Sequence, residues 1–389
     1  MNRGIVIGAL VLLVAACSEP VTDVSAPRLH PGAAPAAVLS PSDGKVVMKG
    51  LDNPRGLAFG PDGLLYVAEA GRGGDGPCFQ NGGTVCYGPS GRISRLRDAT
   101  TEHVVTGLPS YANVASGRAE GPNSISFHSY GGAYVTIGLE ADPNIRTGEL
   151  QGLGRLVQIF PATLHPGRGR GPAHDEWEFV ADLGAFEIAA NPDCGRIDSN
   201  PFAVLAEPGG VIVADAGANT LVRRAANGDL SVFASFTSRY TLPLHDGCPT
   251  SLDGPNTPVR ETVPTSIAVG PDGAYYVGQL AGLPLVQGAA NVYRVVPGQA
   301  PEIYLLGFTW IVSLAFDPAG NLYVLQHAAG TNAASNGSLI RVSPDGLTRT
   351  TILANLVRPT SVAIGPDGAI YISHRGISID KGEVLRFEP

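Results

Sequence analysis

The sequence has little charge, little lysine and few of the bulkiest side chains. Charged residues make up 15% of the 389 positions, and there are only two Trp and two Met. With 44% hydrophobic residues, this composition excludes a disordered chain. The 34 acidic residues outnumber the 26 basic ones, and a net charge of −8 argues against general nucleic-acid binding, which needs a basic surface.

Glycine and proline are abundant instead. The 51 Gly and 32 Pro residues make up about a fifth of the chain, against an ordinary share of roughly 12%. This composition predicts many turns and excludes long helices and coiled coils.

The first residues have the form of an export signal. Met1-Asn2-Arg3 is positively charged, an apolar stretch of about eleven residues follows, and Cys17 ends a run of small residues. The stretch is shorter than the roughly 20 residues that cross a bilayer, so we expect a cleaved lipoprotein signal peptide over residues 1–16 and a lipid on Cys17. Plain secretion and a buried N-terminal helix are the alternatives.

The Pro- and Ala-rich residues 17–44 are then expected to be a tether. These features predict an extracytoplasmic, membrane-anchored lipoprotein, in the outer membrane if the cell is Gram-negative. The lipid anchor is the only membrane contact expected.

Four cysteines lie outside the signal, an even number that suggests disulfides in an exported protein. Of the three possible pairings we favour Cys78–Cys86, which closes a Gly-rich loop, together with Cys194–Cys248. A zinc site is the alternative, but the chain lacks a C-x₂-C spacing.

An internal repeat is the strongest signal in the sequence. It consists of an apolar segment, a turn of the Gly-Pro-Asp-Gly type and a second segment rich in aromatic and β-branched residues. Six copies begin at Pro54, Pro122, Pro201, Pro264, Ile311 and Pro359.

Further apolar segments follow the copies, at 291–296 and 302–306 and again at 338–342 and 349–353. Four antiparallel strands at a period near 47 residues form one propeller blade. The predicted fold is therefore all-β, a six-bladed β-propeller over residues 45–389. The last copy ends after its third strand, at 382–387, so we expect the unassigned strand at 45–48 to complete that blade.

The run DNPRGLAFGPDGLLYVAEAGRGGDGPC, the later ANPD and DSNPF, and the GPDG…YV units resemble the ScyD/ScyE-type family of exported bacterial proteins. The resemblance covers about residues 45–389. It implies an extracytoplasmic propeller related to the NHL, gluconolactonase-like and YWTD groups, and it implies no established reaction.

Polar residues recur where the first strand of a copy begins and where the second ends. Since these strands are antiparallel, we expect such residues on one face, around the central channel. They are Asp52, Asn53, Arg55, Glu69, Glu120, Asn123, Asp198, Asn200, Asp215, Thr265, Gln279, Gln326, Thr360 and His374.

Two interpretations of this ring remain open. Similarity to YWTD-like blades implies that the acids Glu69 and Asp215 hydrogen-bond the neighbouring blade and so join blades. Similarity to gluconolactonase-like propellers implies a divalent cation such as Ca²⁺ at the channel mouth, with oxygen ligands from Asp52, Glu120, Asn123 and Asn200. Gln279 and Gln326 stand where relatives carry Glu, which lowers the charge of the ring.

The chain contains no H-E-x-x-H, G-x-S-x-G or Walker sequence, and Gly71-x-Gly73-x-x-Gly76 leads into more loop rather than a helix. His374 is the only His in the repeat frame on this face. The insertions at 70–92, 139–153, 162–176, 184–200 and 238–262 are expected to be loops that carry specificity or decorate the surface. We predict a monomeric binding or assembly scaffold for a small molecule or protein, without nucleic acid; the alternative is a metal-dependent lactonase or esterase.

Overall fold

The computed structural model describes residues 37–128, 132–160, 177–236, 240–245, 248–251, 261–282, 286–332 and 334–388. The predicted signal peptide, Cys17 and most of the predicted tether lie outside these residues. The chain from Ala37 onward forms one unit. In the part of it that is described, no helix is both long enough and apolar enough to cross a membrane.

Six antiparallel sheets, each of four main strands, form the fold. We number the blades in chain order and give their strands from the innermost to the outermost. The first blade contains β2 (Pro54–Phe59), β3 (Leu65–Glu69), β5 (Thr84–Arg97) and β6 (Thr100–Asn113), with the short additions β4 (Cys78–Gln80) and β7 (Ala119–Glu120). The second contains β8 (Pro122–Phe127), β9 (Ala133–Ile137), β10 (Arg155–Ile159) and β11 (Trp177–Asp182). The third contains β12 (Pro201–Glu207), β13 (Gly210–Asp215), β14 (Thr220–Ala225) and β15 (Leu230–Ser235).

The later blades are built in the same way. The fourth contains β18 (Pro264–Val269), β19 (Tyr275–Gln279), β20 (Ala290–Val295) and β21 (Glu302–Phe308). The fifth contains β22 (Ile311–Phe316), β23 (Leu322–Gln326), β24 (Gly337–Val342) and β25 (Arg349–Leu356). The sixth contains β26 (Ser361–Ile364), β27 (Ile370–His374), β28 (Gly382–Phe387) and β1 (Lys45–Leu51). A separate hairpin pairs β16 (Tyr240–His245) with β17 (Cys248–Ser251).

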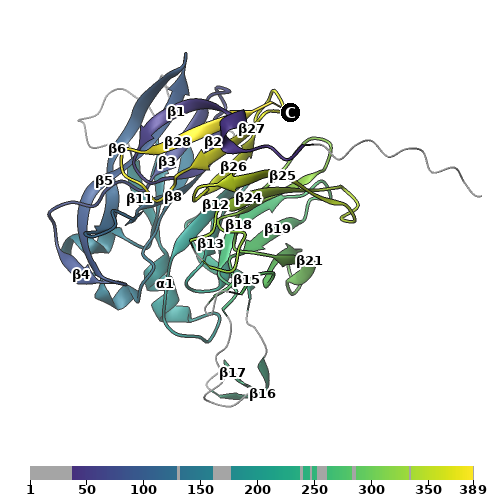
Figure 1. The fold of residues 1–389 in the computed structure, drawn as a ribbon. Helices are drawn as coiled ribbons and strands as arrows, with labels where there is room; N and C mark the ends of the chain where they lie inside the picture. Colours follow the sequence, from purple (N-terminus) through teal and green to yellow (C-terminus); the bar gives the residue numbers. More distant parts are fainter. Residues whose placement is uncertain are drawn as a thin grey trace, which may run out of the picture. The chain divides into compact units, whose positions relative to one another are not determined.

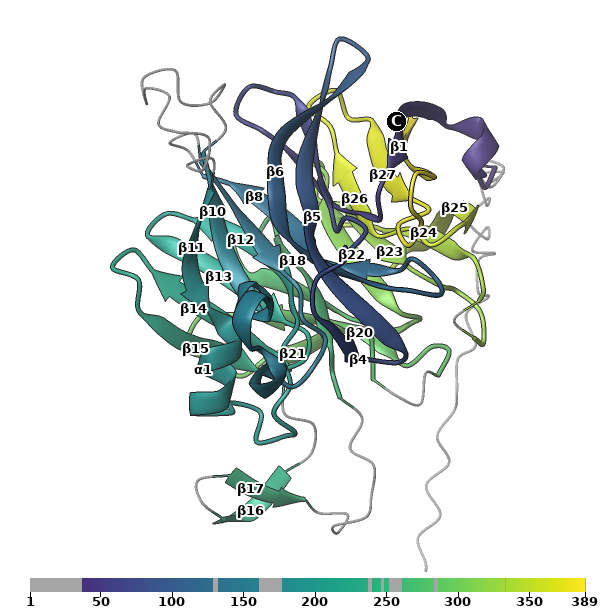
Figure 2. The ribbon, with the colours of Figure 1, turned by 90° about the vertical axis from the view of Figure 1, so that its left-hand side faces the viewer.

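The innermost strands form a closed ring. Each contacts the next around the circle, in the order β2, β8, β12, β18, β22, β26 and back to β2. The blades fan out from this ring, as the two perpendicular views show (Figure 1, Figure 2). The predicted six-bladed β-propeller is confirmed.

The N-terminal strand closes the ring. β1 pairs antiparallel with β28, from Lys45 opposite Arg386 to Leu51 opposite Gly382, so the predicted closure by residues before the first copy is confirmed. The chain already touches the propeller at Leu39, whose N–H donates to Ile352 O at 2.9 Å in the fifth blade. The last residues of the predicted tether 17–44 are thus part of the folded unit.

The repeated turn explains why each copy forms a hairpin. In four blades the turn contains a Gly in the left-handed region, which a side chain would strain; an Asp directly precedes it in three of them and Ala319 in the fifth blade. These glycines are Gly63, Gly273, Gly320 and Gly368, with φ between 75° and 85°. In three of these turns the Asp accepts a hydrogen bond from the N–H two residues on, at Leu64, Ala274 and Ala369.

Serine side chains on the innermost strands join neighbouring blades. Ser266 Oγ accepts a hydrogen bond from Leu314 N at 2.7 Å, and Ser361 Oγ accepts one from Leu57 N at 3.1 Å. The same contact joins Ser124 to Val204 and Ser313 to Val362. Each such bond contributes about 1 kcal/mol and satisfies an inward-facing N–H that the sheet leaves unpaired.

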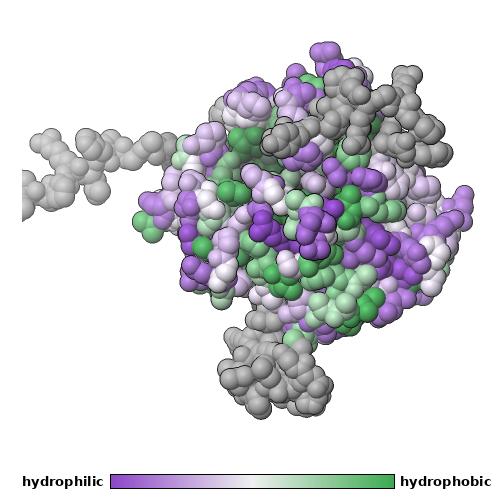
Figure 3. All heavy atoms as spheres, turned by 180° about the vertical axis from the view of Figure 1, so that it is seen from behind, coloured by the Kyte–Doolittle hydropathy of each residue, from purple (hydrophilic) through white to green (hydrophobic). Residues whose placement is uncertain are grey.

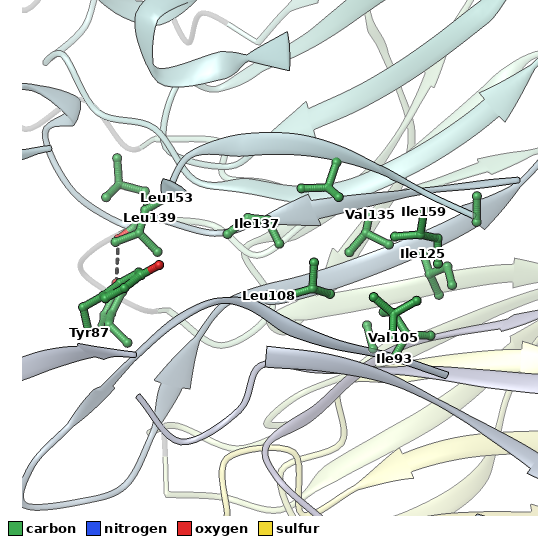
Figure 4. Close-up of a cluster of buried hydrophobic side chains, with 14 of the residues drawn as sticks. Tyr87, Ile93, Val105, Leu108, Ile125, Val135, Ile137, Leu139, Leu153 and Ile159 are labelled. Atoms are coloured by element: carbon green, nitrogen blue, oxygen red, sulfur yellow. Dashed lines mark hydrogen bonds between the residues drawn. The ribbon is translucent and has the colours of Figure 1, made fainter. Parts of the chain in front are cut away.

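The largest hydrophobic cluster lies between the first and second blades (Figure 4). It runs from Ile93 and Val135 in the blades to Tyr87 and Leu139 in the insertions. The insertion at 70–92, predicted as a loop, therefore contains strands: β4 and the start of β5 form a hairpin held by the Cys78–Cys86 disulfide, which is confirmed.

The insertion at 184–200 also differs from the loop prediction, because it begins with helix α1 (Leu183–Ala190). The Asp182 side chain caps the helix by accepting a hydrogen bond from Ala185 N at 2.9 Å. The helix ends at Asn191, which is in the left-handed region with φ 35°. The insertion at 139–153 holds two short 3₁₀ helices, Pro143–Ile145 and Gly148–Gly152.

The other predicted features of the insertions lie partly beyond the described residues. The segment 162–176 and most of 238–262 are outside them. Cys194 is disulfide-bonded, but the side chain of Cys248 is outside the described residues, so the Cys194–Cys248 pairing stays a prediction.

Candidate functional site

A cavity of about 230 Å³ lies where the innermost strands begin. Every blade contributes to its wall, from Arg55 on β2 to Ile377 after β27. We call it the central cavity. Its ionisable wall residues are Arg55, Arg118, Glu120, Glu140, Asp198, Glu261 and His327, and its larger apolar ones are Phe202, Val263, Leu280, Val312 and Ile377.

A second cavity of about 200 Å³ follows the same innermost strands. It shares Phe202, Thr265 and Val312 with the central cavity. The hollow therefore continues along the ring axis.

One recurring hydrogen bond positions the loops around the central cavity. In each blade a residue just after the second strand donates its N–H to a carbonyl just before the first strand. The six pairs are Ala70–Asn53, Gly138–Gly121, Ala216–Asn200, Leu280–Val263, His327–Trp310 and Gly376–Arg358, at 2.8–3.1 Å.

The residue before the first strand is often in the left-handed region although it is not Gly. Asn53, Val263, Trp310 and Arg358 have φ between 46° and 54°. For a β-branched residue such as Val263 this conformation is strained. Val263 lines the central cavity, so this strained backbone lies in the cavity wall. The hydrogen bond from Leu280 N to Val263 O holds it there.

Two arginines and two glutamates form a network on the cavity wall. Arg55 Nη2 lies 3.2 Å from Glu120 Oε1, and Arg118 Nη2 lies 3.0 Å from the same oxygen and 2.7 Å from Glu140 Oε2. Arg55 is buried, and desolvation lowers the pKa of its guanidinium. Desolvation and then the charge of Glu120 raise the pKa of Glu140. The network is internally balanced, with two positive and two negative groups.

The two other acids of the cavity wall, Asp198 and Glu261, have less positive charge beside them among the described residues. Desolvation raises the pKa of Asp198 to about 6, and the carboxylates of Asp215 and Glu261 act in the same direction. Arg196 opposes this shift, but its guanidinium is 3.8 Å from Asp198 and 74% exposed. The pKa of Glu261 is also raised, first by burial and then by Asp193.

His327 presents a neutral ring to the central cavity. Its Nδ1 donates to Pro359 O at 2.9 Å, because a carbonyl oxygen can only accept, and Nε2 is left as an acceptor. Burial, together with the charges of Arg358, Arg55 and Arg118, lowers the pKa of His327 to about 4, although the hydrogen bond to Pro359 O opposes the shift.

Most residues of the predicted ring have hydrogen-bond partners within the fold. Those that end a second strand form hydrogen bonds within their own blade or the loop that leads into it, so the prediction that Glu69 and Asp215 join neighbouring blades is wrong. Glu69 accepts from Asp52 N at 2.7 Å and from Arg92 at 2.7 and 2.9 Å; Asp215 accepts from Asn200 N at 2.6 Å; Gln279 accepts from Asn291 N at 3.1 Å; Gln326 accepts from Thr309 N at 2.6 Å; and His374 accepts from Val357 N at 2.8 Å.

The threonines of the ring join blades. Thr265 Oγ1 donates to Ile311 O at 2.7 Å, and Thr360 Oγ1 donates to Pro54 O at 2.7 Å. Asn53 is likewise committed, because its amide donates to Gly71 O and Gly117 O. Of the fourteen predicted residues, the central cavity brings together five: Arg55, Glu120, Asp198, Asn200 and Thr265.

The predicted metal ligands do not assemble as a set of four. Asp52 does not line the central cavity, and its Oδ2 lies 2.6 Å from Arg72 Nη2 and 3.0 Å from Arg92 Nη2. Glu120, Asn123 and Asn200 do meet, around Gly138: a Cβ on that glycine would lie 2.4–2.9 Å from one atom of each.

Those three side chains already have partners. Glu120 binds both arginines and accepts from Asn123 Nδ2 at 3.2 Å, and Asn200 Oδ1 accepts from Leu139 N at 3.2 Å. Among the described residues only Asn123 Oδ1 and Arg55 Nε at this place are buried without a hydrogen-bond partner. A cation would have to displace the positive charge of Arg55 from Glu120, so the residues do not fit the predicted calcium site.

Four ionisable residues of the cavity were missed by the sequence prediction: Arg118, Glu140, Glu261 and His327. All lie outside the repeat frame but within a few positions of it, since His327 directly follows Gln326 and Glu261 precedes Pro264 by three residues. A search for charged or His residues just before and just after each copy of the repeat could have found these four residues.

Comparison with known proteins supports the fold. A protein of Thermus thermophilus predicted to be an oxidoreductase (glucose dehydrogenase) has a TM-score of 0.53 and 18% identity, over 88% of this chain and 98% of its own. The calcium-binding protein regucalcin of Agrobacterium tumefaciens has a TM-score of 0.51 and 12% identity, over 91% and 98%. A gluconolactonase of Xanthomonas campestris has a TM-score of 0.51 and 9% identity, over 88% and 89%.

At these identities the likeness establishes the fold alone. No protein-family profile matches the chain. No curated protein sequence matches it either. The similarity to the ScyD/ScyE-type family therefore stays a prediction.

Proposed function

We propose that this chain is an extracytoplasmic, lipid-anchored binding propeller that holds a small organic molecule in the central cavity. The observation that carries the proposal is the convergence of all six blades on one hollow whose charged groups are partly desolvated. Location and anchoring rest on the signal-like residues up to Cys17.

The size of the cavity limits the ligand. About 230 Å³ is less than the roughly 300–1,000 Å³ typical of pockets for drug-sized molecules. Apolar walls such as Phe202 and Leu280 face the same space as the charged groups. We therefore expect a compact molecule with one apolar part and at least one polar or charged group.

The outer surface gives less support for a large protein partner. On the face seen in Figure 3, hydrophilic and hydrophobic side chains are interspersed. The exposed large hydrophobic residues of the described chain belong to separate strands and turns, for example Phe179, Val232, Ile303 and Leu347. We therefore place binding in the central cavity.

A cavity-filling variant tests the binding function. We expect wild-type full-length protein to bind at least one member of a library of compact polar molecules, detected by ligand-observed NMR. Leu280→Phe, on a half-buried wall position, should abolish that binding. Leu347→Phe makes the same change at a side chain that is 84% exposed on a turn, and should leave binding intact. Equal binding by all three proteins would place the ligand elsewhere and refute the proposal.

A metal-dependent lactonase or esterase is the second candidate. It is favoured by the meeting of Glu120, Asn123 and Asn200 at Gly138 and by likeness in fold to a gluconolactonase. It is opposed by the two arginines that occupy Glu120.

Metal analysis of purified protein, with a lactonase and esterase panel, decides between the two candidates. Metal-dependent turnover that disappears in Glu120→Ala would establish the hydrolase. A metal-free protein that is inactive on the whole panel would leave the binding function.

A further inference from the structure

The charges around the central cavity are not evenly distributed. Arg55 and Arg118 are taken up by Glu120 and Glu140, at 2.7–3.2 Å. The two positive and two negative charges of this network therefore largely cancel, and little net charge is left to attract a ligand. Asp198 and Glu261, which we call the acidic wall, line the same cavity, and among the described residues neither has an ion pair as close as these.

Little positive charge lies near the two carboxylates of the acidic wall among the described residues. Among the described residues Asp198 has one ion-pair contact, with Arg196 at 3.8 Å, and Glu261 has none. The side chain of Asp198 is 25% exposed, so it is open to the cavity yet partly desolvated. Arg196 opposes the pKa shifts of both acids, but it is 74% exposed, so solvent screens its charge.

More negative charge lies next to the acidic wall. Asp215 Oδ1 accepts from Asn200 N at 2.6 Å and from Gly217 N at 3.2 Å, and both of those residues line the central cavity. Asp215 also acts to raise the pKa of Asp198, and Asp193 acts in the same way on Glu261. Both are buried and keep their carboxylates in fixed positions through hydrogen bonds, Asp193 to Asn219 at 2.8 Å and Asp215 to Ser199 at 2.7 Å. A preorganised negative field thus faces this part of the cavity.

The arrangement does not match a compact metal ion. Within the part of the chain that the structure describes, no three Asp, Glu, His or Cys side chains are placed to hold one ion. The oxygens of Asp193 and Asp215 are occupied by N–H and O–H donors. A diffuse negative field beside apolar walls suits a larger monovalent cation with a hydrocarbon body.

We propose that the acidic wall makes the central cavity selective for a compact organic ammonium ion. The ammonium group would donate to Asp198 and Glu261, and the hydrocarbon part would contact Phe202, Val263 and Leu280. This inference rests on the proposed binding function and names its ligand class. No covalent step is involved.

The selectivity for an ammonium ion can be tested with three probes that share a phenyl ring but differ in charge: benzylammonium, benzyl alcohol and benzoate. We expect benzylammonium to bind the full-length protein about tenfold more tightly than benzyl alcohol, because a charge-assisted hydrogen bond replaces a neutral one. Benzoate should bind most weakly. Dissociation constants from isothermal titration calorimetry at pH 7.5 and low salt give the comparison.

A charge-matched pair of double variants locates the effect. Asp198→Asn/Glu261→Gln should lose the tenfold preference for benzylammonium. Asp229→Asn/Glu302→Gln removes the same two charges at exposed positions of the same two blades that do not line the cavity, and should keep it. Loss of the preference in both pairs would mean that overall charge, not the acidic wall, is responsible, and would overturn the inference.

Other outcomes separate this inference from the function on which it rests. Tightest binding of benzoate, or equal binding of the three probes, overturns the ammonium assignment but leaves a binding cavity. Binding of Ca²⁺ that needs Asp198 and Glu261, without binding of benzylammonium, also overturns it. If no probe binds, the ammonium inference fails, and the library experiment with Leu280→Phe decides the binding function independently.

Discussion

Glu187 on α1 provides a sharp test of the electrostatics beside the central cavity. Its side chain is 1% exposed, and among the described residues no hydrogen bond of good geometry reaches its carboxylate oxygens, although the backbone of Asp198 lies near enough to oppose the rise of its pKa. Desolvation, followed by the charges of Asp215 and Asp193, raises the pKa of Glu187 from 4.5 to about 8. The folded protein therefore holds this group neutral near pH 7.

The sign of the resulting pH dependence follows from linkage. In the unfolded chain Glu187 ionises at its ordinary pKa, so the folded state loses relative stability as pH rises from 4.5 towards 8. With these two values the loss between pH 5 and pH 7.5 is about 3 kcal/mol. Glu187→Gln keeps the shape of the neutral acid and removes the titration.

We therefore expect the variant to gain stability over wild type by about 3 kcal/mol as pH rises from 5 to 7.5. Urea denaturation at several pH values, followed by fluorescence, gives the difference in free energy of unfolding. The slope of that difference with pH is the test, because it is insensitive to how well the amide packs. The control Glu178→Gln alters an exposed side chain on β11 and should give a flat difference. A flat difference for Glu187→Gln would refute the reasoning.

Three further predictions concern the ring. Deletion of residues 45–51 removes β1, including the buried Met48 and Leu51, and should replace one cooperative unfolding transition by a broad one in calorimetry; an unchanged transition contradicts the closure role. Thr360→Val removes the 2.7 Å hydrogen bond to Pro54 O and should lower the free energy of unfolding by about 1 kcal/mol, measured in urea; a value equal to wild type would mean that the bond contributes nothing. The pKa of His327 is about 4 in the folded protein and 6.5 in the unfolded chain. Its contribution to the free energy of unfolding is therefore complete above pH 6.5 and falls by about 3 kcal/mol as the pH is lowered towards 4. His327→Asn should lack this fall, and a parallel pH profile of the two proteins would count against the assignment.

The fold could be predicted from local sequence because each blade repeats the same hairpin signal. The Asp-Gly turn and the flanking apolar strands are encoded within about sixteen residues, so six copies and the missing last strand sufficed to infer a closed ring. Helix α1 was missed because a local signal, the Asp182 cap followed by Leu, Ala and Glu, was outweighed by the Gly- and Asp-rich residues after it.

The site was less predictable, because a residue's role depends on which neighbour the ring places beside it. Glu69 ends a second strand and Glu120 stands just before a first strand, so both are predicted on the same face, yet Glu69 is enclosed within its blade while Glu120 faces the central cavity. His327 and Glu261 lie on loops that approach the axis only after the ring has closed. The amino-acid type indicates that a residue forms polar contacts, but only the tertiary structure decides whether those contacts are to the protein itself or to a ligand.

The pairing of β1 with β28 also constrains when this protein can become functional. More than three hundred residues separate the paired strands, so the last blade cannot form until the whole chain is available. Until then β1 is an unpaired edge, and the six segments around the central cavity have no fixed spacing. If the chain is exported as proposed, a translocating intermediate is a row of blades without a binding site, and ligand can be captured only after the C-terminal strand has arrived.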